Sequence, residues 1–125
     1  MNLVDSSGWL EYFADGKNAE FFSSAIEDID SLIVSTINLY EVYKKVLIEK
    51  DEEAAIQAIA LMQQARIVDV NIPISLTAAR LSYDLKIPMA DGLILSTARL
   101  NDATLWTQDS DFEKIPDAKF IKRSK

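Results

Sequence analysis

The feature of this chain that most constrains its fold is a regular alternation of short apolar runs with longer segments of helical spacing. Residues 2–5, 31–37, 66–72 and 103–109 are compact runs typical of buried strands, and residues 118–122 have the character of a short edge strand. Between these runs, apolar residues recur every three or four positions, as they do along one face of a helix. This alternation predicts an α/β fold with a mainly parallel sheet.

The same pattern predicts a single domain with several helices. A chain of 125 residues has the usual length of one domain, so we expect residues 1–125 to fold as one unit. The predicted helices cover about 7–14, 18–29, 38–50 and 51–65, and two more begin beside Pro73 and Pro88.

Composition restricts the chemistry open to such a domain. The chain has no Cys and no His, which removes thiolate chemistry, the commonest general base and the usual ligands of zinc. With a net charge of −7, it also lacks the excess of cations by which many proteins bind nucleic acid through its phosphates. Any catalysis must therefore use carboxylates, hydroxyls, Lys or Arg, and any contact with nucleic acid needs a few placed cations or a bound metal.

The hydropathy of the chain bears on its expected location in the cell. The chain has no apolar run of about 18 residues, the length needed to span a membrane. Its N-terminus lacks the basic segment, apolar stretch and small-residue cleavage site of a signal peptide. We therefore expect a cytoplasmic protein with no membrane partner.

Acidic residues fall where the predicted strands end. In an open α/β sheet, ligands bind beyond the carboxyl ends of the parallel strands, so polar residues at those ends are candidates for a site. Four carboxylates from distant parts of the sequence are expected at or near this edge: Asp5 after the first strand, Glu41 one turn into the helix after the second, Asp91 in the first turn of a later helix, and Asp109 after the strand 103–109.

Such a group of like charges calls for a cation. Two carboxylates about 4 Å apart repel by roughly 4 kcal/mol at an effective dielectric of about 20, so several together must share protons or surround a metal. Oxygen ligands suit hard cations such as Mg²⁺ or Mn²⁺. A cation of this kind activates water for attack on a phosphate, which makes His and Cys unnecessary.

Each carboxylate also has a purely structural explanation. Asp5 precedes Ser-Ser-Gly and is suited to cap a helix, and Asp91 lies where the helix dipole favours a negative charge. Glu41 stands near Lys44 and Lys45 and is explained as a surface residue. Asp109 fits a turn. The metal site therefore depends on the joint arrangement of the four residues.

Four motifs give the chain a resemblance to a known family. They are "LVDSSGWLEYF", "STINLYEVYKKV", "IPMADGLILSTARL" and "LWTQDSDFEKI", and together they extend over nearly the whole chain. In these motifs and in size the chain resembles a PIN-domain nuclease, and specifically the toxin of a VapBC-type toxin–antitoxin pair. The resemblance implies a three-layer domain with about five strands, and a Mg²⁺- or Mn²⁺-dependent endoribonuclease whose metal ligands and catalytic residues are Asp5, Glu41, Asp91 and Asp109.

The resemblance also implies supporting residues. Ser6 and Thr107 match small polar positions that usually support the family's metal site. Asp111 fits a frequent acidic position, so it competes with Asp109 for the fourth acidic role. We expect Asp109 to serve the metal, and Asp111 to cap the turn that leads to a buried Phe112.

Partners follow from the same resemblance. It implies an RNA substrate, a homodimer, and an antitoxin that covers the helical surface near the acidic groove and reaches the carboxylates with a basic side chain. Aromatic and apolar residues crowd the predicted helices, and we expect some of them at interfaces: Trp9, Leu10, Tyr12, Phe13, Phe21, Phe22, Tyr40 and Tyr43. The candidate cations for RNA are Lys44, Lys45, Arg80, Lys86 and Arg99.

Three other classes of protein offer alternative interpretations of the same sequence. A haloacid-dehalogenase-type phosphatase needs a second Asp two residues after Asp5, where Ser7 stands. A receiver-type domain needs an acidic pair at the end of the first strand, whereas Val4 precedes Asp5, and it needs an acceptor Asp after a later strand, whereas Asp69 is predicted in the middle of one. The alternative that stays open is a PIN-like scaffold with weak activity that binds protein or RNA.

Overall fold

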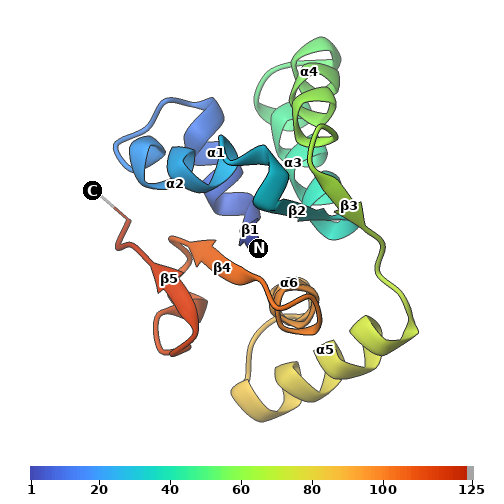
Figure 1. Cartoon of the computed structure of the whole chain (residues 1–125). Coiled ribbons are helices and arrows are strands. Elements are labelled where there is room, and N and C mark those ends of the chain that lie inside the picture. The colour runs from blue at the N-terminus through green and yellow to red at the C-terminus, as the bar shows by residue number, and fades with distance from the viewer. Residues whose placement is uncertain (124–125) are drawn as a thin grey trace.

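The structure is a computed structural model that describes residues 1–123 (Figure 1). Five strands and six α-helices alternate along these residues, with two short 3₁₀ turns, Ile29–Ser31 and Ser110–Phe112. The strands are β1 Asn2–Val4, β2 Leu32–Ser35, β3 Arg66–Val68, β4 Thr104–Thr107 and β5 Ala118–Phe120. The helices are α1 Ser6–Phe13, α2 Ala19–Ile26, α3 Thr36–Glu49, α4 Glu52–Met62, α5 Ile72–Leu85 and α6 Met89–Leu100.

The strands form one sheet in the order β3-β2-β1-β4-β5, and every neighbouring pair is parallel. The first strand therefore lies at the centre, and its neighbours on the two sides are β2 and β4 (Figure 1). Parallel pairing requires a crossover between each strand and the next. Helices provide it for the first four strands, and the segment with the 3₁₀ turn Ser110–Phe112 joins β4 to β5. The predicted α/β fold with a parallel sheet of five strands is confirmed.

Helices cover both faces of this sheet, as the alternating direction of strand side chains requires. Val4 and Val34 point into a core formed with α1, α2, α3 and α4. Leu3, Ile33 and Leu105 point to the other face, where α6 packs and α5 lies outside it. The two groups of helices accordingly lie on opposite sides of the strands, which gives the predicted three layers (Figure 1).

Side-chain caps define where several helices begin. Ser35 and Asn38 form a capping box at the start of α3. The carboxylate of Asp51 accepts the backbone N–H of Ala54 at 2.8 Å at the start of α4. Asn71 caps α5, which ends where Lys86 adopts a left-handed conformation with φ of 59°.

The strand predicted for residues 66–72 is too long. β3 ends at Val68, because Asn71 already serves as the cap of α5 and accepts the N–H of Ile74 at 3.0 Å. Asp69 therefore follows the strand, and its expected position within a strand is wrong. The strands predicted for residues 31–37 and 103–109 are likewise shortened at their ends by the turns and helix that follow.

No helix in the described part of the chain combines the length and the apolar character needed to cross a membrane.

Candidate metal centre

The acidic residues singled out in the sequence gather around the carboxyl ends of the central strands. Parallel strands bring these ends to one edge of the sheet, so residues far apart in the chain become neighbours there. Asp5 directly follows β1, Glu41 lies in the second turn of α3, Asp91 lies in the first turn of α6, and Asp109 and Asp111 follow β4.

Asp5 is a buried carboxylate held by three donors. It is only 3% exposed, and it accepts hydrogen bonds from the backbone N–H of Ser6 at 2.8 Å, the Ser7 hydroxyl at 2.8 Å and the Thr107 hydroxyl at 2.9 Å. Burial nevertheless raises its pKa from 3.8 to about 6, because the hydrogen bonds from Ser7 and Thr107 only partly offset the lost hydration. Asp5 is also the N-cap residue of α1. The same side chain therefore caps a helix, as the structural explanation expects, and lies at the carboxyl end of β1.

Glu41 is connected to Asp5 through Ser6. The Ser6 hydroxyl donates to Oε1 of Glu41 at 2.8 Å, while the backbone N–H of the same serine donates to Asp5. The negative charge of Glu41 contributes to the raised pKa of Asp5, after burial and the charge of Asp109. The structure thus brings Glu41, Ser6 and Asp5 together.

The two lysines that would make Glu41 an ordinary surface residue contact other partners. Lys45 forms a salt bridge of 3.1 Å with Glu49 one turn further along α3. The Lys44 ammonium lies 5.8 Å from the centre of the Tyr40 ring. Glu41 is half-buried and faces the sheet edge through its contact with Ser6.

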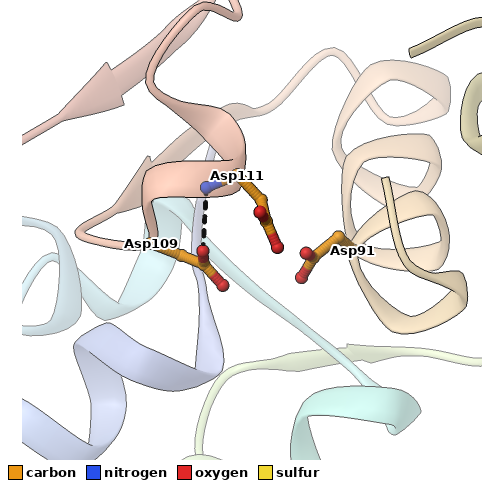
Figure 2. A group of neighbouring side chains, drawn as sticks. All are labelled: Asp91, Asp109 and Asp111. Atoms are coloured by element: carbon orange, nitrogen blue, oxygen red, sulfur yellow. Dashed lines mark hydrogen bonds between the residues drawn. The ribbon is translucent and has the colours of Figure 1, made fainter. Parts of the chain in front are cut away.

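Asp91 has the most perturbed pKa of this group. It is 8% exposed, and its pKa is raised from 3.8 to about 8. Burial is the largest cause, followed by a side-chain hydrogen bond with Asp111 and the negative charges of Asp109 and Asp5. Figure 2 shows the carboxyl groups of Asp91 and Asp111 pointing toward each other across the gap between α6 and the turn after β4.

The cap predicted for Asp111 is wrong, because Asp109 makes it instead, whereas the metal role predicted for Asp109 stays a prediction. The Asp109 carboxylate accepts the backbone N–H of Asp111 at 2.9 Å and caps the 3₁₀ turn Ser110–Phe112 (Figure 2). Asp109 stands two residues before this amide in the sequence, which is the spacing of an Asx-type cap. The carboxylate of Asp111 is left to meet Asp91, while Phe112 is fully buried as expected.

Three of these carboxylates are close enough to share a cation. One oxygen from each of Asp91, Asp109 and Asp111 lies within 4.8 Å of the other two (Figure 2). Two oxygens on opposite sides of Mg²⁺ are about 4.2 Å apart, since each bond is about 2.1 Å long. The donor set and spacing therefore fit Mg²⁺ or Mn²⁺ after small side-chain movements, whereas Asp5 and Glu41 lie outside this closest group.

The cations expected to contact RNA have protein partners on the surface. Arg99 forms a two-pronged salt bridge with Asp117, at 2.8 and 3.0 Å, near the far end of α6 from the acidic residues. This pairing lowers the pKa of Asp117. Arg80 pairs with Asp84 at 3.1 Å within α5. Their role toward RNA stays a prediction.

The sequence reasoning missed one buried residue beside the site. Asn38 is fully buried, and its side-chain amide donates to the Ser6 hydroxyl at 3.0 Å. The available signal was the spacing from Ser35 to Asn38, which is that of a capping box and predicts an inward-facing side chain at the start of the helix.

Comparisons with known proteins agree with this arrangement. The sequence model of the PIN domain matches residues 3–118. None of the curated protein sequences matches the chain.

Three solved structures illustrate the proteins that share this fold. A chain of a toxin–antitoxin complex from Klebsiella pneumoniae is 22% identical, with a TM-score of 0.77 and 98% of this chain and 97% of that chain covered. VapC20 from Mycobacterium tuberculosis, described as a sarcin-ricin loop cleaving toxin, is 15% identical, with a TM-score of 0.78 and coverage of 95% and 98%. VapBC2 from Rickettsia felis, bound to promoter DNA, is 19% identical, with a TM-score of 0.74 and coverage of 97% of both chains. At these identities the likeness shows a common fold.

Proposed function

Because the chain belongs to the PIN-domain family, we propose that it is a metal-dependent endoribonuclease that hydrolyses RNA phosphodiester bonds as the cytoplasmic toxin of a type II toxin–antitoxin pair. The observation that carries this proposal is the group formed by Asp91, Asp109 and Asp111, with oxygens within 4.8 Å of one another. Burial and then the neighbouring carboxyls raise the pKa of Asp91 to about 8, so a divalent cation would relieve an unfavourable arrangement of charge.

Each residue of the site has a distinct part in this reaction. Asp91, Asp109 and Asp111 hold the cation from one side, and Asp5 and Glu41 complete the metal site from the side of β1 and α3. When bound, the cation neutralises charge on the phosphate oxygens and lowers the pKa of the water that attacks phosphorus. The Thr107 hydroxyl keeps Asp5 in a fixed orientation through its hydrogen bond of 2.9 Å.

An apolar groove supports the proposal of an antitoxin partner. Between α1, α3 and α4 lies a hollow of about 380 Å³, lined by residues that include Leu10, Phe13, Val46 and Leu61. An apolar side chain of a partner segment could fill it, and the net charge of −7 on this chain favours a basic partner. The toxin–antitoxin complex from Klebsiella pneumoniae, which has the same fold, makes an antitoxin the partner of first choice.

Single-stranded RNA cleavage with added Mn²⁺ tests this function. We expect cleavage that EDTA abolishes, and a loss of at least about a hundredfold in Asp91→Ala, because the variant removes a metal ligand. Asp84→Asn is the matched control, since Asp84 is exposed on α5 and forms a salt bridge with Arg80 away from the acidic site. Saturation with Mn²⁺ at about 100 times its dissociation constant should stabilise the wild type by roughly 2.7 kcal/mol.

The results separate the enzyme from the scaffold. If the wild type binds Mn²⁺ and RNA but cleaves nothing, the chain is a binding module. If Asp91→Ala cleaves as fast as Asp84→Asn, the activity does not come from this site and the proposal is wrong.

A further inference from the structure

The Asn38 side chain connects two elements that meet below the acidic edge. Its Oδ1 accepts the backbone N–H of Ser35 at 3.1 Å, at the junction of β2 and α3. Its Nδ2 donates to the hydroxyl of Ser6, the first residue of α1, at 3.0 Å. Both contacts are buried, so neither half of the amide can exchange its partner for water.

The backbone of Ser35 fixes which way this amide points. The oxygen and nitrogen of an Asn amide are alike in shape, so the hydrogen-bond partners decide between the two orientations. A backbone N–H can only donate, and its position is set by the end of β2. A reversed Asn38 would place two donors face to face in a buried site and leave both without an acceptor, which is strongly unfavourable.

The orientation of Asn38 in turn fixes the proton of Ser6. A hydroxyl has one proton to donate, and the Ser6 oxygen receives a hydrogen bond from Asn38. The Ser6 proton is therefore directed to its other partner, Oε1 of Glu41, at 2.8 Å. A hydrogen bond to Oε1 restrains the last torsion of the Glu41 side chain and hence the direction of its second oxygen.

We propose that Asn38 is a positioning residue of this site, which directs the Ser6 hydroxyl toward Glu41 and so holds the Glu41 carboxylate in the orientation that binds metal. This inference rests on the proposed function, because that function makes Glu41 part of the metal site. It assigns to Asn38 a role distinct from helix capping, although the same side chain performs both.

The neighbouring Ser35 offers a matched control for the capping role. The Ser35 hydroxyl accepts the N–H of Ile37 at 3.3 Å and belongs to the same capping box. Ser35→Ala therefore weakens the start of α3 while Asn38, Ser6 and Glu41 keep their hydrogen bonds. A purely structural role predicts similar effects from Ser35→Ala and Asn38→Ala, whereas a positioning role predicts that only Asn38→Ala changes the site.

Calorimetric titration with Mn²⁺ tests the relay. We expect Asn38→Ala and Ser6→Ala each to weaken Mn²⁺ binding by about tenfold, the size of one lost hydrogen bond to a charged group. The double variant should be no weaker than Ser6→Ala alone, since Asn38 acts through Ser6. Ser35→Ala should stay within about twofold of the wild type. Additive losses in the double variant, or an equal loss in Ser35→Ala, would overturn the proposal.

NMR of the metal-free protein tests the same relay without metal or activity. Asn38→Asp keeps an acceptor for Ser35 and removes the amide donor to Ser6, which gives a second variant beside Asn38→Ala, and circular dichroism checks that both fold. We expect the Ser6 hydroxyl proton to exchange with water at least about tenfold faster in Asn38→Asp or Asn38→Ala than in Ser35→Ala. The Glu41 carboxyl carbon signal should shift as it does in Ser6→Ala. Unchanged exchange and an unmoved Glu41 signal would refute the role of Asn38, whereas a wild type that binds no Mn²⁺ would instead refute the proposed function.

Discussion

At the scale of single residues, the site holds protons that an unfolded chain would release. Folding raises the pKa of Asp91 from 3.8 to about 8, because the residue is buried and hydrogen-bonded to Asp111 beside other carboxylates. Folding also raises the pKa of Asp5 from 3.8 to about 6, mainly through burial. At a pH between the unfolded and the folded pKa of either residue, the unfolded chain has lost a proton that the folded protein still binds. The free energy of unfolding therefore falls as the pH rises through this range.

We therefore predict that the metal-free protein loses stability from about pH 4 to pH 8, first through Asp5 and Asp91 together and above about pH 6 through Asp91 alone. Asp91→Asn should flatten most of this dependence and should be more stable than the wild type at pH 8 in EDTA. Urea unfolding in EDTA across this range measures it, with the exposed Asp84→Asn as control. Equal slopes in the wild type and Asp91→Asn would show that Asp91 ionises normally.

The limits of sequence reasoning at this scale are visible in the turn after β4. Ligands bind beyond the carboxyl ends of parallel strands, and this rule identifies Asp5 and Asp109 because it requires only that the end of each strand be recognised in the sequence. The rule could not distinguish the two aspartates of the turn, because they are only two residues apart and either could cap the turn while the other faces Asp91. Asn38 was missed for a related reason: a buried amide shows its second partner, Ser6, only once α1 and α3 are packed together.

At the scale of secondary-structure elements, the position of Asp91 depends on the close approach of α5 and α6. The next residue, Gly92, faces α5, where an added Cβ would contact the Ser82 hydroxyl and lie 2.9 Å from the carbonyl oxygen of Ala78. A backbone oxygen cannot retreat cheaply. The two helices therefore pack at this distance only because residue 92 has no side chain.

We predict that Gly92→Ala destabilises the protein by about 1–3 kcal/mol, the usual cost of overpacking, although Ala in an exposed helix is more stable than Gly by about 1 kcal/mol. Gly92→Ala combined with Ser82→Ala should recover part of the loss, because it removes the hydroxyl but not the Ala78 carbonyl. The free energy of unfolding in urea measures both effects. A Gly92→Ala variant as stable as the wild type would mean that α5 moves freely against α6.

The elements themselves were largely predictable, and the reason is physical. Strands such as 31–37 and helices such as 38–50 have strong local periodicity, which tertiary packing reinforces. The residues at which these elements begin and end were less predictable, because they depend on side chains that cap the helices. The segment 66–72 has β-branched residues up to its end in the sequence, but Asn71 ends the strand early by capping α5.

At the scale of the whole molecule, the aromatic residues expected at interfaces are mostly within the fold. Trp9 and Phe22 are fully buried in the core beneath α1 and α2. Of the eight aromatic and apolar residues expected to supply an interface, Tyr40 is among the exposed large hydrophobic residues. These eight residues therefore offer little exposed surface for the predicted homodimer, and a larger exposed apolar surface lies elsewhere on the molecule.

That surface lies on α5. Ile72, Leu76 and Tyr83 are 75%, 68% and 70% exposed, and their spacing of four and seven residues places them on one helix face. Arg80 and Lys86 lie against the Tyr83 ring, at 5.9 and 5.2 Å from its centre, and add positive charge to an acidic protein. An exposed apolar stripe of this kind marks an interface, and a single helix ridge suits a two-fold contact between identical chains.

We predict that the protein forms a homodimer in solution through α5, and that Leu76→Glu converts it to a folded monomer. A buried Glu at the centre of the stripe would lose its hydration and meet its own copy across the two-fold axis, which is unfavourable for association. Gln57→Glu on α4 adds the same charge away from this face and should leave the dimer intact. Light scattering at micromolar concentration, with circular dichroism as a check of folding, distinguishes the variants. A wild type that is monomeric would contradict the dimer, and a Leu76→Glu variant that remains dimeric would move the interface to another surface.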